Sequence, residues 1–151
     1  MEPLFITSST VTQLLRQLPE GDVFAIVADS RSRDVELLPE EFAGEVDLTC
    51  VRPPSSPRSV LFPMREVVVG AEAEGADEQR SATLVGVRAC DLRALRVLDQ
   101  VLLAGEFRDP FYASRREHTL IISVDCVMAA EECFCTRVEG MPHPNGSEPV
   151  S

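Results

Sequence analysis

Two short apolar runs, residues 82–87 and 119–124, constrain the fold of this chain more than any other feature. Each run has the length and the β-branched content of a buried strand. Between them, leucines recur at helical spacing over residues 91–104, and Gly105 follows as a natural helix stop. This order predicts a β-α-β unit with a right-handed crossover. We therefore expect an α/β fold with a mixed or parallel sheet.

The rest of the chain fits one domain. Residues 11–18 have the spacing of an amphipathic helix, residues 22–28 read as a strand, and four prolines within residues 51–66 exclude a long regular helix there. At 151 residues and 44% hydrophobic content, the chain is long enough to bury a core without disulfides. We expect a single α/β module over residues 1–140. Residues 141–151, with three prolines and no apolar pattern, are expected to form a disordered tail.

The charge of the chain excludes several classes of function. The net charge is −11, and all 14 basic residues are arginines. This balance argues against binding to nucleic acid or to an anionic membrane surface, and it excludes lysine-based catalysis. No apolar run approaches the roughly 18 residues of a membrane-spanning helix. The N-terminus lacks the basic and long apolar regions of a signal peptide, so we expect a cytoplasmic chain without membrane insertion.

Four of the five cysteines follow the two predicted strands. Cys90 comes after the first strand, and Cys126, Cys133 and Cys135 come after the second. Parallel neighbours would bring these residues to one edge of the sheet, where open α/β sheets usually bind ligands. Thiols are kept reduced in the cytoplasm, so the cluster favours metal or redox chemistry over disulfides. The sequence thus predicts one site at a cysteine-lined edge.

The residues alone leave the nature of this site open. Four thiolates suit a [4Fe-4S] cluster, and they equally suit a structural zinc ion. The spacing matches neither zinc ribbons nor bacterial ferredoxins, and inert buried thiols are a third interpretation. Arg88 and Arg93, on either side of Cys90, would offset the thiolate charge. Cys50 is expected to be a buried thiol outside the site.

Other chemistry finds little support in the sequence. The two histidines, His118 and His143, form no recognisable pair with another catalytic or metal-binding residue. No Gly-x-Gly-x-x-Gly run is present, so this chain is not expected to bind a nicotinamide or flavin itself. We therefore predict no catalytic residue.

Several stretches resemble one family. Residues 86–99, 105–122 and 133–136, with the proline-rich residues 57–66, are similar to the β subunits of sulfhydrogenases and the A subunits of anaerobic sulfite reductases. The resemblance extends from about residue 28 to residue 140. It implies an iron-sulfur electron-transfer subunit of a multi-subunit redox enzyme, partnered by flavin-containing and catalytic subunits. The family's cysteine motifs fall on Cys90, Cys126, Cys133 and Cys135, which the resemblance makes ligands of a [4Fe-4S] cluster.

The chain departs from the family pattern in two places. Ala89 stands where the family commonly has proline. The family also continues into a ferredoxin-like region with two Cys-x-x-Cys-x-x-Cys runs, which this chain lacks, so we expect a fragment, a truncated product or a stand-alone N-terminal module. Two rival functions remain, a structural zinc-binding or metal-free assembly module and a redox protein using Cys133 and Cys135 as a dithiol.

Overall fold

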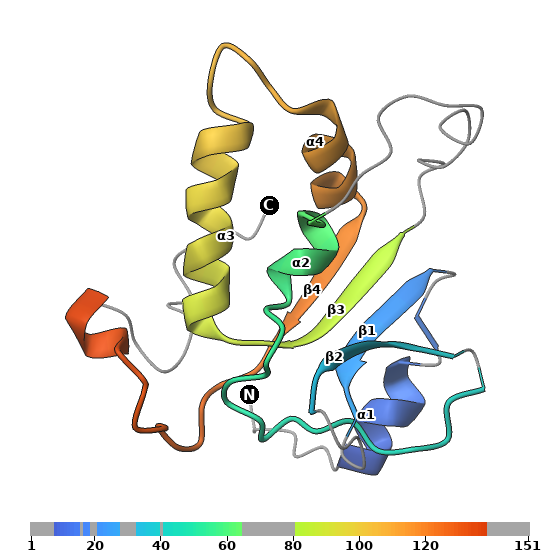
Figure 1. The fold of residues 1–151 in the computed structure, drawn as a ribbon. Coiled ribbons are helices and arrows are strands. Elements are labelled where there is room, and N and C mark those ends of the chain that lie inside the picture. The colour runs from blue at the N-terminus through green and yellow to red at the C-terminus, as the bar shows by residue number, and fades with distance from the viewer. Residues whose placement is uncertain are drawn as a thin grey trace, which may run out of the picture.

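A four-stranded sheet in the order β2-β1-β3-β4 lies at the centre of the fold (Figure 1). The computed structural model describes residues 8–15, 17–18, 21–27, 33–39, 41–64 and 81–138, so the predicted tail at residues 141–151 lies outside the described residues. The elements are α1 (Ser8–Leu15), β1 (Asp22–Ile26), β2 (Val35–Leu38), α2 (Arg58–Leu61), β3 (Ala82–Val87), α3 (Ala89–Leu102), α4 (Pro110–Glu117), β4 (Thr119–Ser123) and the 3-10 helix η1 (Cys135–Val138).

The strand pairing confirms the predicted mixed sheet. β1 runs antiparallel to β2 and parallel to β3, and β3 runs parallel to β4. The helices α3 and α4 connect β3 to β4, so the predicted β-α-β unit is present. Among the described residues, no helix has the length and apolar character needed to cross a bilayer.

The observed helices differ from the predicted ones in their boundaries. The first helix ends at Leu15 instead of Leu18, and the proline-rich segment contains the one-turn helix α2 directly after Pro57. The helix α3 begins at Ala89, two residues earlier than predicted. Asp91 is therefore its third residue, and the Asp91 carboxylate reaches back to accept a 3.3 Å hydrogen bond from the Arg88 amide. This contact satisfies a backbone group that the first helical turn leaves free.

The two faces of the sheet bury separate apolar clusters. Leu84 of β3 packs in a cluster with residues of α2, α3 and α4, namely Leu61, Leu92, Leu95 and Tyr112. Val85, the next residue along β3, packs on the other face with Leu15 of α1, Ala25 of β1 and Val46. Successive side chains of a strand point to opposite faces, so β3 supplies both cores. Because α3 begins two residues after the end of β3, the position of this strand also determines where α3 starts.

A β-bulge at Gly86 interrupts this alternation. The pairing with β4 shifts between Val85 and Val87, and Gly86 has a φ of +86°. Because Gly86 is one extra residue, Val87 falls in the same cluster as Leu84 and not in that of Val85. The next residue, Arg88, is then directed into the protein and is only 2% exposed.

A polar cluster joins α4 to α3. The Tyr112 hydroxyl donates a 2.6 Å hydrogen bond to Oδ1 of Asp99, and Nε of Arg116 lies 3.3 Å from the same oxygen. Asp109 caps α4 by accepting a 2.9 Å hydrogen bond from the Tyr112 amide. These contacts hold α4 against the last turn of α3.

Substituting Gly86 tests the bulge. We expect Gly86→Ala to lower the free energy of unfolding by about 1–2 kcal/mol, because a side chain in left-handed backbone costs that much even where space is free. A Cβ at this position would have no atom within 4 Å, so the loss reports conformation and not a clash. Urea unfolding measures it, and Gly105→Ala, at a position without a positive φ, should change little. Equal losses of unfolding free energy in Gly86→Ala and Gly105→Ala would contradict the assignment of a left-handed bulge residue to Gly86.

Tyr112, the only tyrosine in the chain, gives a second test by titration. Burial raises its pKa, and the hydrogen bond to the Asp99 carboxylate raises it further. Since the neutral phenol is favoured in the folded state, the resulting stability is complete below pH 10 and is lost as the pH rises above the ordinary tyrosine pKa. Phenolate absorbance should therefore be absent from the folded chain at pH 10.5 and appear together with unfolding. Ionisation at pH 10 with the fold intact would contradict this.

Candidate functional site

The four predicted site cysteines lie on two segments that follow neighbouring parallel strands. Cys90 is the second residue of α3, directly after β3. Cys126 comes three residues after β4, and Cys133 and Cys135 follow in the same segment. Figure 1 shows this segment leaving β4 and turning back toward the first residues of α3. Both segments therefore start from the same end of the sheet.

The electrostatics of the thiols show that they lie near one another. Partial burial raises the pKa of Cys90 to about 11, and the charges of Asp91, Cys135 and Cys126 add to the increase. Burial also raises the pKa of Cys126, with further increases from Cys135, Cys133 and Asp125. The charges of Cys126, Cys133 and Cys135 thus disfavour ionisation of Cys90, of Cys126 or of both. The structure brings them within electrostatic reach.

The thiols do not form a ready ligand sphere. In the part of the chain that the structure describes, no three Cys, His, Asp or Glu side chains are arranged to hold a metal ion. The five cysteines there are free thiols. Sγ of Cys133 accepts a 3.3 Å hydrogen bond from the Ala130 amide, which turns this sulfur toward its own loop. Gathering all four sulfurs would require the segment after β4 to move.

Arg88 lies at the junction of the segments that surround the site. Its Nη1 donates hydrogen bonds to the backbone oxygens of Val124, at 3.3 Å, and Asp125, at 2.7 Å. Its Nη2 donates to the backbone oxygens of Leu48 and of Cys50, the latter at 3.0 Å. The guanidinium is therefore bound by two segments that are far apart in sequence.

The two arginines predicted to offset thiolate charge differ in environment. The positive charge of Arg88 lowers the pKa of Cys126 and so opposes the effect of burial on that thiol. Its Nε is buried and has no hydrogen-bond partner among the described residues. Arg93 is exposed on α3, and its role stays a prediction.

Residues 47–52 also contact the site, and the sequence reasoning missed them. Oδ1 of the buried Asp47 accepts hydrogen bonds from the Thr49 amide at 2.8 Å, the Thr49 hydroxyl at 2.6 Å and the Cys50 amide at 3.1 Å. Burial raises the pKa of Asp47, but these bonds outweigh it and lower the pKa overall. Nη1 of Arg52 donates a 2.9 Å hydrogen bond to the Glu132 backbone oxygen, beside Cys133. The Asp-x-Thr pattern, typical of a side-chain-stabilised turn, was the available signal.

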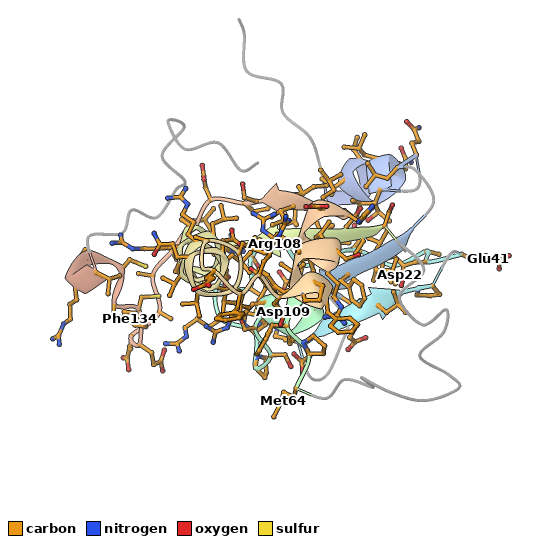
Figure 2. The ribbon with its side chains drawn as sticks, turned by 90° about the horizontal axis from the view of Figure 1, so that it is seen from above. Asp22, Glu41, Met64, Arg108, Asp109 and Phe134 are labelled. Carbon is orange, nitrogen blue, oxygen red and sulfur yellow. The ribbon has the colours of Figure 1, made fainter. Side chains whose placement is uncertain are left out.

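Apolar side chains on the surface surround the later cysteines. Val127 is 77% exposed, Met128 67% and Phe134 55%. Figure 2 shows Phe134 at the end of the molecule opposite Glu41. Grouped exposed apolar side chains mark interaction sites more often than isolated ones do.

Comparison with known proteins gives one partial match. Over 79 residues the chain is 33% identical to the sulfhydrogenase 2 subunit beta of Pyrococcus furiosus, a match that covers 52% of this chain and 22% of that protein. The chain therefore corresponds to less than a quarter of the relative's length. No family model and no solved structure matches. A relationship to a hydrogenase β subunit is supported, whereas the resemblance to sulfite reductase A subunits stays a prediction.

The raised pKa of Cys90 predicts slow alkylation. At pH 8 a thiol with a pKa of about 11 has roughly one hundredth of the thiolate of a thiol with a pKa of 9.0. Iodoacetamide should therefore modify the metal-free chain slowly at Cys90, with a rate that rises up to about pH 11. Asp91→Asn removes a negative charge, lowers this pKa and should increase the rate at pH 8. The tryptic peptide 89–93 gives the rate by mass spectrometry.

Asp125→Asn is the matched control for this measurement. The Asp125 charge raises the pKa of Cys126 and is not among the charges that raise that of Cys90. The Cys90 rate should therefore be unchanged in this variant. Fast alkylation of Cys90 at pH 8 in the unmodified sequence would contradict the prediction.

Proposed function

We propose that this chain is an electron-transfer subunit of a hydrogenase-type redox complex and holds a [4Fe-4S] cluster through Cys90, Cys126, Cys133 and Cys135. One observation carries the proposal: these four thiols lie on two segments that follow the neighbouring parallel strands β3 and β4 at one end of the sheet. The partial match to a sulfhydrogenase β subunit supports the same class of complex.

The donor set fits an iron-sulfur cluster. Four thiolates supply one ligand for each iron. Burial and nearby negative charge keep Cys90 and Cys126 protonated in the metal-free chain, and bound iron would stabilise the thiolates and release their protons. Cys90 also lies in the first turn of α3, whose free amide groups are suited to donate hydrogen bonds to sulfur.

Binding would require local movement of the chain. Because the described residues form no ready ligand sphere, the part of the chain with Cys133 and Cys135 would have to close on Cys126 and the start of α3. That segment is exposed along most of its length, so it can move without disturbing the two buried clusters. Cys90 itself would stay in place, held by the helix.

The protein's part in the reaction is positioning and tuning. When bound, the cluster supplies one-electron transfer at a potential that depends on burial, nearby charge and hydrogen bonds to sulfur. Asp91 and Asp125 would add negative charge beside the thiolates, and Arg88 would offset part of it. The chain itself would make and break no substrate bond.

Exposed apolar side chains beside the cysteines would meet the partner subunits. Val127, Met128 and Phe134 lie between or next to the proposed ligands. The centres of protein interfaces are apolar, and docking there would bring a flavin-containing or catalytic subunit close to the cluster. We place this assembly in the cytoplasm.

Metal analysis tests the proposal. After anaerobic purification, the chain should contain about four irons with acid-labile sulfide and absorb visible light. Cys90→Ser should remove most of that absorbance, because it deletes one of four ligands. Cys50→Ser is the matched control and should retain it.

Other results would favour the rival functions. Stoichiometric zinc without iron would contradict the cluster and support a structural zinc module. A reversible disulfide between Cys133 and Cys135, with no chromophore, would support a dithiol redox protein. If the chain contains neither a metal nor this disulfide, the metal-free assembly module is the remaining interpretation.

A further inference from the structure

The environment of Arg88 is unusual for a cation. The side chain is 2% exposed, and a buried charge is costly unless hydrogen bonds replace its hydration. Four backbone oxygens make that replacement, those of Val124, Asp125, Leu48 and Cys50. All four are neutral acceptors on irregular segments and none belongs to a strand or helix.

These acceptors come in two pairs from separate parts of the chain. Nη1 binds the pair just after β4, next to Cys126, and Nη2 binds the pair around residues 48–50. The two nitrogens belong to one rigid planar group, so the backbones of Asp125 and Cys50 are held at a fixed separation. Arg88 thus fixes the position of Cys50 relative to Cys126.

Two further contacts make residues 47–52 a defined unit. Asp47 binds the amides of Thr49 and Cys50, which sets the turn that presents the two oxygens to Arg88. Arg52 then donates to the Glu132 oxygen next to Cys133. The segment is therefore linked through Arg88 to the part of the chain with Cys126, and it contacts the part with Cys133 directly.

We propose that Arg88 is a positioning residue that joins the backbone of residues 47–52 to the segment of Cys126, so that residues 47–52 border the cysteine site without supplying a ligand to it. The inference deepens the proposed function and relies on that function only for the identity of the bound group. The chemistry of Arg88 suits this task, because a guanidinium presents several donors in one plane and stays charged. Lysine, with one nitrogen, cannot span both pairs of acceptors.

Intramolecular cross-linking of the metal-free chain tests the inference. With Cys90, Cys133 and Cys135 replaced by serine, the full chain retains only Cys50 and Cys126. A short flexible bismaleimide should link these two thiols efficiently while Arg88 is present. Arg88→Met should lower the yield roughly tenfold, because it removes charged hydrogen bonds between the two segments. Arg88→Lys should restore part of the yield, and Arg93→Met, an exposed arginine of the same helix, should leave it unchanged.

Several outcomes would overturn the inference. One is efficient cross-linking in a folded Arg88→Met chain, and another is an equal decrease in Arg93→Met. If Arg88→Met does not fold, hydrogen exchange of the unmodified chain decides: the amides of Thr49, Cys50 and Val124 should open together, and unequal opening rates would refute the coupling. These measurements need no metal. A chain without iron that still cross-links as expected would refute the proposed function and leave the role of Arg88 intact.

Discussion

The hydrogen bonds of the Arg88 guanidinium are the interaction on which the arrangement of the site depends. A cation placed inside a protein must be given acceptors, and here the acceptors are backbone oxygens from two distant segments. Among the described residues, backbone hydrogen bonds to the sheet hold only the first residue of each segment, from Asp47 to Ile26 and from Val124 to Val87. One buried charge therefore organises the irregular part of the fold, just as the apolar clusters organise its regular part.

The parts of the fold that follow local patterns could be predicted from the sequence. The apolar runs at residues 82–87 and 119–124 are buried strands with a leucine-rich helix between them, and hydrophobic periodicity is a sufficient signal for such elements. The positions of Cys90 and Cys126 after these strands followed from the same reasoning. Convergence of the four sulfurs in one site was also predicted, and it stays a prediction, because it depends on a segment without periodicity.

The remaining features depend on long-range contacts that carry little local signal. Counting alternate residues along β3 puts Val85 and Val87 on one face, but the extra residue Gly86 separates them. The sequence predicted only that Arg88 offsets the charge of the neighbouring Cys90. No nearby residue indicates that its guanidinium donates to the backbone oxygen of Leu48. Such a contact joins residues about 40 positions apart, beyond the range of any periodicity argument.

The bulge at Gly86 has a consequence for the geometry of α3. Val85 and Val87 pair with the consecutive residues Ile122 and Ser123, so a strand without Gly86 would keep both its register and the sidedness of Val87. The extra residue is therefore needed neither for pairing nor for burial. A bulge bends its strand and increases the local twist. The bulge at Gly86 therefore changes the angle at which the chain leaves the sheet. This angle sets the direction of the first turn of α3, which contains Cys90.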